Sequence, residues 1–211
     1  MKESDVVRIA LIVGSTRPNR FADVPAGWIE KGSAERSDMT LEKLDLRDYP
    51  LPFFDEPVSP SASGGVWSNP ATESWRRKIA EFDGFIVTAA EYNHGPTAVL
   101  KNALDSALFE WKDKPISFVG YGGVGGARAV EQLRLTAIEL QMAPLKIAVH
   151  IGLEPFLGVL MQGKTLDDYP YLALSRSAMF DQLVWWARAL AKARALSVER
   201  ADTGILASIT E

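Results

Sequence analysis

Cysteine is absent from the 211 residues of the sequence, which excludes disulfides, a catalytic thiolate and cysteine-ligated metal centres. Histidine is also scarce, and a chain with 2 histidines cannot build a histidine-rich metal site. No stretch approaches the roughly 20 consecutive apolar residues that a membrane-spanning helix needs. The lack of cysteine is compatible with a reducing compartment. We therefore expect a soluble, cytoplasmic protein without a bound metal.

The sequence also lacks a strong excess of either positive or negative charge. The sequence has 23 basic and 27 acidic residues and a formal net charge of -4, too mild to indicate binding to nucleic acid or to an anionic membrane. Arg8 interrupts the first apolar run, which argues against a signal peptide. The content of 47% hydrophobic and 24% charged residues is typical of a globular protein. We expect a single domain over residues 1–200 and a loose C-terminal tail over residues 201–211.

Apolar runs and helical patterns alternate along the chain. Strands are expected at residues 6–13, 41–46, 84–89, 115–119 and 145–151. Helical spacing occurs at residues 21–31, 72–81, 97–109, 127–142 and 174–196. This alternation predicts right-handed crossovers and a doubly wound α/β fold, with helices on both faces of a parallel sheet. For five strands, the flavodoxin-like order 2-1-3-4-5 is the natural prediction.

The loop after the first strand reads Gly-Ser-Thr-Arg-Pro-Asn-Arg from Gly14 to Arg20, followed by a helical segment. Hydroxyl groups at Ser15 and Thr16, backbone amides at a helix start and the guanidinium groups of Arg17 and Arg20 suit an oxyanion. The alternative is an ordinary strand-to-helix turn, in which Ser15 or Thr16 caps the helix and both arginines face solvent.

The loop after the third strand reads Glu-Tyr-Asn-His-Gly-Pro from residue 91 to 96. Asn93 and exposed backbone amides can pair with the edge of a heterocycle, and Tyr92 offers a flat face for a ring. Glu91 and His94 could form an acid–base pair, although neighbouring loop residues seldom have the required geometry. This loop therefore indicates recognition of a ring more than acid–base catalysis.

Two glycine-containing motifs match nucleotide-binding patterns. Residues 120–125 fit Gly-x-Gly-x-x-Gly, but no acidic residue ends the next predicted strand, so we interpret the loop at residues 120–126 as a flexible wall beside a ring. Residues 158–165 fit the phosphate-loop pattern Gly-x4-Gly-Lys-Thr, with Lys164 and Thr165 at its end. Pro170 follows too closely for a helix to open there, so a phosphotransferase is the less favoured alternative.

Three motifs together resemble the NAD(P)H-dependent FMN reductases. They are Gly-Ser-Thr-Arg after the first strand, the long segment Glu-Tyr-Asn-His-Gly-Pro-Thr-Ala-Val-Leu-Lys-Asn-Ala-Leu-Asp at residues 91–105, and the glycine loop at residue 120. The segment at residues 48–57 is also similar to the loop that these proteins place after their second strand. Ala90 stands where family members commonly carry proline, which leaves the turn at residue 91 less rigid.

The resemblance implies a flavodoxin-like fold that binds FMN. The phosphate would lie on Ser15, Thr16 and Arg17, with Arg20 as a further candidate. The ring edge would meet the residues from 91 to 95 and the glycine loop; the implied contacts are Glu91, Tyr92, Asn93, His94, Gly95, Gly122 and Gly123.

By the same resemblance, the flavin would take hydride from NAD(P)H and pass electrons to a quinone, an azo compound, a free flavin or a metal oxyanion by a ping-pong mechanism. The protein would then supply no catalytic acid or base. Family members usually form homodimers or homotetramers. Possible interface aromatics are Phe53, Phe54, Trp67, Phe156, Trp185 and Trp186, although for about half of them core packing is the favoured interpretation. The main alternative is a flavodoxin-type electron carrier, which the two loop arginines and the mild net charge disfavour.

Overall fold

The computed structural model describes the backbone of residues 6–209 and the side chains of residues 6–197. Its strands are β1 (Val7–Val13), β2 (Met39–Asp45), β3 (Gly84–Ala90), β4 (Pro115–Tyr121), β5 (Ala143–Pro144) and β6 (Val149–Ile151). Its α-helices are α1 (Asp23–Ser33), α2 (Pro70–Ala80), α3 (Ala98–Asp105), α4 (Ala127–Glu139), α5 (Leu153–Met161) and α6 (Pro170–Ile209). A short 3-10 turn, η2 (Leu166–Asp168), precedes α6.

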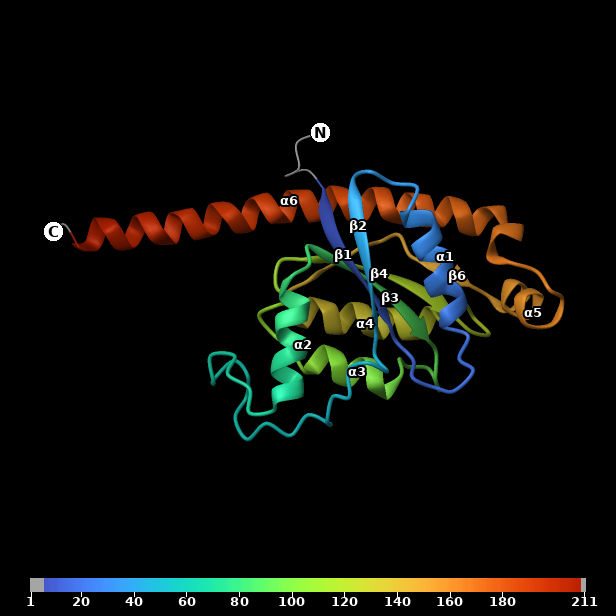
Figure 1. The fold of residues 1–211 in the computed structure, drawn as a ribbon, viewed down its shortest axis with the longest axis horizontal. Coiled ribbons are helices and arrows are strands. Elements are labelled where there is room, and N and C mark those ends of the chain that lie inside the picture. Colours follow the sequence, from blue (N-terminus) through green and yellow to red (C-terminus); the bar gives the residue numbers. More distant parts are fainter. Residues whose placement is uncertain (1–5, 210–211) are drawn as a thin grey trace.

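The strands form one parallel sheet in the order β2-β1-β3-β4-β5, and β6 also pairs with β4. The predicted doubly wound sheet and its strand order are therefore confirmed. Figure 1 shows α1 and α6 on one face of the sheet and α2, α3 and α4 on the other. Strand β1 explains both layers, because Ile9 and Leu11 face the α1 and α6 side whereas Ala10 and Ile12 face the opposite side.

The predicted fifth strand is divided in two. Its first part, β5, pairs with Pro115 and Ile116, and its second part, β6, pairs with the end of β4. Between them, the Ser117 hydroxyl donates to the carbonyl of Ile147 at 2.7 Å, and the side chain of Gln182 accepts from the Ile147 amide at 3.1 Å. Side chains from β4 and α6 thus replace the ladder bonds of a continuous strand.

Helix α6 is longer than the predicted segment 174–196. It begins at Pro170, the favoured first position of a helix, and runs to Ile209. Figure 1 shows its C-terminal part extending away from the sheet. A tail over residues 201–211 that is separate from the domain stays a prediction, and residues 210–211 lie outside the described part of the chain.

Lys114 is buried immediately before β4, at the end of the sheet opposite to the loops after β1 and β3. Its ammonium group donates to the carbonyls of Ile79 and Ala80, at 3.3 and 3.2 Å. Burial lowers the pKa of Lys114 to about 8, and the nearby charge of Arg194 acts in the same direction. Because the unfolded chain keeps a pKa near 10.5, the folded state binds fewer protons between these two values.

Lys114 should therefore give the protein a stability that rises with alkaline pH. We expect the free energy of unfolding of the wild type, relative to Lys114→Met, to increase by about 2 kcal/mol between pH 8 and pH 10. Urea unfolding of both proteins across this range measures the difference. The exposed neighbour Lys112 provides the control, since Lys112→Met should leave the pH dependence of the wild type intact. A constant difference between wild type and Lys114→Met would show that burial does not affect this amine.

Candidate functional site

The loops that follow β1, β3 and β4 meet at one edge of the sheet and enclose a hollow. Among the predicted site residues, this hollow is lined by Ser15, Arg17, Arg20, Glu91, Tyr92 and Gly122. A second hollow shares Ser15, Arg17 and Tyr92, and adds Thr16, Leu51, Phe53 and the start of α3. Tyr92 therefore lies between the two. The predicted residues that line neither hollow are Asn93, His94, Gly95 and Gly123.

The loop after β1 begins at a point where only glycine fits. The amide of Gly14 donates to the Thr88 hydroxyl at 3.1 Å, and its carbonyl accepts from the Thr97 hydroxyl at 2.5 Å. A Cβ at position 14 would lie 2.4 Å from the Thr88 carbonyl oxygen. Thr97 also caps α3 by accepting from the amide of Leu100 at 3.2 Å. The loop is thereby fixed to β3 and α3 at its first residue.

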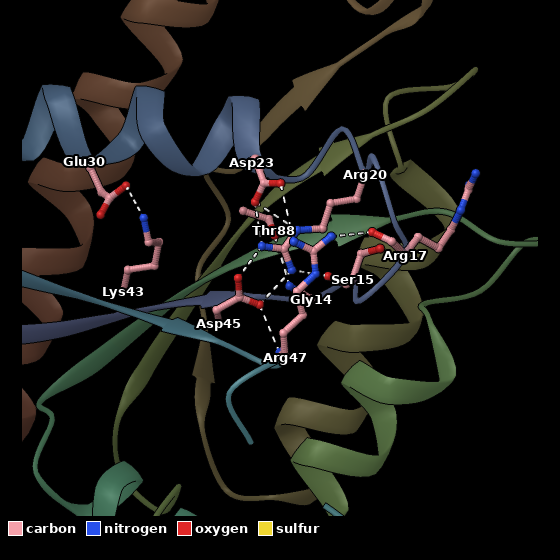
Figure 2. Close-up of polar contacts among 10 residues, drawn as sticks. All are labelled: Gly14, Ser15, Arg17, Arg20, Asp23, Glu30, Lys43, Asp45, Arg47 and Thr88. Carbon is pink, nitrogen blue, oxygen red and sulfur yellow. Dashed lines mark hydrogen bonds and ion pairs between the residues drawn. The ribbon is translucent and has the colours of Figure 1, made fainter. Parts of the chain in front are cut away.

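Arg20 is committed to contacts within the protein. Its guanidinium donates to the carboxylates of Asp23 and Asp45 and to the carbonyl of Ser15, as Figure 2 shows. The side chain is 3% exposed, whereas that of Asp45 is 19% exposed. The hydrogen bonds that Arg20 donates to Asp45 and then to Asp23 raise the pKa of Arg20 despite its burial, and they lower the pKa of the Asp45 carboxyl. This geometry indicates that Arg20 shapes the loop and leaves few donors for a ligand.

Arg17 has the opposite environment. It is exposed and lines both hollows, and no carboxylate among the described side chains forms an ion pair with it. Figure 2 shows its side chain running away from the Arg20 cluster. Its guanidinium carbon lies 5.9 Å from the ring centre of Tyr92. Arg47 donates to the Arg17 carbonyl and so holds the backbone at this position. Arg17 is therefore a cation available to an anionic ligand.

The loop after β3 contains a tight turn. The amide and carbonyl groups of Tyr92 and Gly95 pair with each other, at 2.9 and 3.0 Å. The two residues between them both have positive φ angles, 50° at Asn93 and 71° at His94. This is the backbone of a type I′ turn, which asparagine tolerates and histidine adopts less readily. The turn brings Tyr92 to the hollow and turns His94 away from it.

Glu91 and His94 do not form the conceivable acid–base pair. The Glu91 carboxylate is bound by the backbone and side chain of Arg128, and its side chain is 6% exposed. Burial would raise the pKa of Glu91, but the Arg128 hydrogen bonds outweigh it and hold that pKa below its ordinary value. His94 contacts Arg128 as well, through Nε2. Arg128 thus occupies the position that a proton relay would need.

The glycine loop after β4 closes the other side of the hollow. Gly122 has a φ of 138° and donates to the Ile151 carbonyl at 3.3 Å, while the Gly125 amide donates back to Gly122 at 3.0 Å. At Gly126, φ is 67° and a Cβ would lie 2.6 Å from the Tyr121 nitrogen. The loop therefore packs backbone against backbone, and presents its own backbone to the hollow at Gly122.

Sequence reasoning missed several residues of this region. Tyr121, Phe21 and Phe156 line the hollow, and the Phe21 ring packs against the other two, with ring centres 5.3 and 4.5 Å apart. The position of Tyr121 at the end of β4 was a usable signal, because ligands bind beyond the carboxyl ends of parallel strands. Phe156 belongs to α5, which the sequence did not predict. Arg128 gave no signal, since its partner lies 37 positions earlier.

The alternative phosphate loop at residues 158–165 is wrong. Gly158 lies inside α5, and Lys164 and Thr165 follow the end of that helix; Thr165 caps only the short 3-10 turn η2 and does not open an α-helix. A Cβ at Gly158 would lie 2.0 Å from the Tyr169 hydroxyl, so close packing accounts for this glycine. The backbone needed to wrap a phosphate is absent from this segment.

Three of the six aromatics considered as interface anchors are exposed: Phe53 is 79% exposed, Phe54 44% and Trp185 64%. Trp67 is buried, and Phe156 and Trp186 are partly buried against the core. No helix within the described part of the chain is long and apolar enough to cross a bilayer. Within the same described part of the chain, no three histidine, aspartate or glutamate side chains are grouped so that they could hold a metal ion.

Comparison with known proteins supplies a family. Residues 7–154 match the family model described as NADPH-dependent FMN reductase. The chain is 38% identical to an NAD(P)H-dependent FMN reductase of Schizosaccharomyces pombe, over 68% of this chain and 73% of the yeast protein. It is 31% identical to an NADPH:quinone oxidoreductase of Arabidopsis thaliana, over 65% of this chain and 69% of the plant protein.

A similar fold is found in the flavoenzyme FerB, an NAD(P)H:(acceptor) oxidoreductase from Paracoccus denitrificans. The TM-score is 0.66 at 21% identity, and the match covers 87% of this chain and 98% of FerB. At this identity the likeness concerns the fold alone.

Proposed function

Because the chain belongs to the NADPH-dependent FMN reductase family, we propose that it binds FMN at the edge formed by the β1, β3 and β4 loops and catalyses hydride transfer from NAD(P)H to a small acceptor. The observation that carries this proposal is the pairing of two features. Arg17 is an uncommitted cation, and the hollow beside it is walled by Tyr92, Tyr121 and backbone of the glycine loop. A long ligand fits this arrangement if its anionic end meets Arg17 and its flat ring occupies the hollow.

Each loop has a distinct task in this proposal. Ser15, Thr16 and Arg17 bind the phosphate, and Arg20 positions them by holding the Ser15 carbonyl. Backbone groups at Glu91 and Tyr92 meet the ring edge, with Gly122 on the opposite side, since these residues line the hollow. Asn93 and Gly123 lie outside its lining and would contact the ring from its margin. Bound FMN would supply the redox chemistry, which needs no acid or base from the protein. Glu91, paired with Arg128, stays ionised and contributes no proton.

Two substrates would use the site in turn, so we propose a ping-pong mechanism. The acceptor would be a quinone, an azo compound, a free flavin or a metal oxyanion; the relative from Arabidopsis thaliana, named as a quinone oxidoreductase, favours the quinone. The protein would work as a homodimer or homotetramer, for which Phe53, Phe54 and Trp185 offer exposed aromatic surface.

Anaerobic mixing with NADPH or NADH separates this enzyme from a flavodoxin-type carrier. We expect the visible absorption of the FMN-loaded protein to bleach within seconds, because the reaction requires direct hydride transfer from the nicotinamide. Steady-state rates with a quinone should give parallel double-reciprocal lines. A loaded protein that bleaches with dithionite but with neither nicotinamide would be a carrier and would overturn the proposal.

A further inference from the structure

Helix α4 receives its N-terminal cap from a different loop. Its N-cap residue, Gly126, has no side chain to accept from the first free amides of the helix. Instead, the Glu91 carboxylate accepts from the Arg128 amide at 3.1 Å. A carboxylate at this position also interacts favourably with the positive end of the helix dipole. The loop after β3 is thereby joined to the start of α4.

Two side chains of α4, Arg128 and Gln132, also form hydrogen bonds with the same loop. Arg128 Nε donates to Glu91 at 2.5 Å, and Arg128 Nη1 donates to His94 Nε2 at 2.8 Å. One turn further along the helix, the Gln132 amide donates to the His94 carbonyl at 2.7 Å. A guanidinium has no acceptor atom, so Nε2 of His94 must accept this bond. Arg128 and Gln132 therefore hold the turn at Glu91, the residue before it, and at His94, its third residue.

The turn needs such support. Asn93 and His94 lie in the left-handed region, where a residue with a side chain costs about 1–2 kcal/mol. The pair of hydrogen bonds between Tyr92 and Gly95 closes the turn but does not fix it relative to the sheet. Ala90 adds no rigidity of the kind that a proline would give. A strained turn of this kind persists only where its surroundings determine it strongly, and here α4 provides those surroundings.

We infer that Arg128 is a positioning residue of the flavin site: with Glu91 it forms a clamp that fixes the 91–95 turn against α4 and so sets the ring-facing donors of that turn. This inference rests on the proposed function. Because negative charge develops on the ring during reduction, fixed donors favour reduced over oxidised flavin. The clamp would therefore affect flavin affinity and reduction potential without contacting the reacting atoms.

The first test uses the apoprotein, so it does not depend on flavin. In Arg128→Gln, the amides of Gly95 and Arg128 should exchange hydrogen about tenfold faster or more, as expected for loss of charge-assisted hydrogen bonds. The matched control is Arg134→Gln, two turns along α4, which loses bonds to the carbonyls of Leu145 and Lys146. It should leave exchange at residues 92–95 unchanged. Equal acceleration in both variants, or none in Arg128→Gln, would overturn the clamp.

The second test measures the flavin. Arg128→Gln should weaken FMN binding by about tenfold. It should weaken the binding of reduced FMN more than that of oxidised FMN, so the midpoint potential of the bound flavin should shift to more negative values. Arg128→Lys keeps the charge but lacks the planar fork, so it should behave like Arg128→Gln; full rescue by lysine would contradict the geometry. If Arg128→Gln fails to fold, the same measurements can be made on Arg128→Lys. If the wild type binds no FMN, the proposed function fails while hydrogen exchange still tests the clamp.

Discussion

Asp45→Ala should lower the free energy of unfolding by about 2–4 kcal/mol, the largest loss of stability that we expect from one substitution in this site. Asp45 accepts from Arg20 Nη1 at 2.7 Å and from the Arg47 amide at 3.0 Å. Its removal leaves the guanidinium of Arg20 buried, with the half-exposed Asp23 as its remaining carboxylate partner. Chemical denaturation at neutral pH measures the loss. The loop from Ser15 to Arg20 should become more mobile as well, because the Arg20 guanidinium also donates to the Ser15 carbonyl at the start of that loop.

The exposed Asp48, three positions later, provides the matched control for this loss. Asp48→Ala removes the same charge and should change stability by no more than about 0.5 kcal/mol. Replacing both partners, as Arg20→Met with Asp45→Leu, should restore much of the stability, because no buried charge is left unpaired. If Asp45→Ala is as stable as Asp48→Ala, the ion pair does not organise the loop.

Arg17→Ala should weaken FMN binding by about 1.5–3 kcal/mol, or roughly ten- to hundredfold, with little change in stability. Arg17 is exposed and has no carboxylate partner among the described side chains, so its loss costs the free protein little. Fluorescence titration of the apoprotein measures the affinity. Riboflavin, which lacks the phosphate, should bind Arg17→Ala and wild type alike. Arg77→Ala, which removes a surface arginine of α2, should have no effect on FMN. Unchanged FMN affinity in Arg17→Ala would place its guanidinium in solvent.

The difference between Arg17 and Arg20 shows where prediction from sequence ends. Both arginines stand in one loop and both were predicted as candidate phosphate ligands. Asp45, the residue that draws Arg20 into the protein, is the last residue of a different strand, β2, 25 positions later. Only the pairing of β2 with β1 brings them together, and a single sequence does not show such a contact. The loop could therefore be identified from its residue types, but the division of tasks within it could not.

The same distinction applies to the fold. Strands β3 and β4 are buried along their whole length and β1 everywhere except at Arg8, so their mainly apolar pattern predicted all three to within about two residues. The break between β5 and β6 depends on Ser117 and Gln182, whose hydrogen bonds reach across the tertiary structure. Helix α5 escaped prediction because it has nine residues, mostly apolar, and gives no clear helical period.

The flavin site divides in the same way. The motif at residues 91–105 indicated the ring-binding turn, and the structure places Glu91 and Tyr92 at the hollow. The support of that turn by Arg128 and Gln132 comes from the next helix but one. Such support is a tertiary contact between elements, and no local pattern encodes it.

The most direct measurement of the central claim is a parallel titration of the wild-type apoprotein with FMN and with riboflavin. If the phosphate is held by the loop after β1, FMN should bind at least about a hundredfold more tightly than riboflavin, since several charge-assisted contacts depend on that phosphate. The purified protein should also be yellow, with FMN as the released chromophore. A colourless protein that binds neither flavin, or that binds both with equal affinity, would contradict the account.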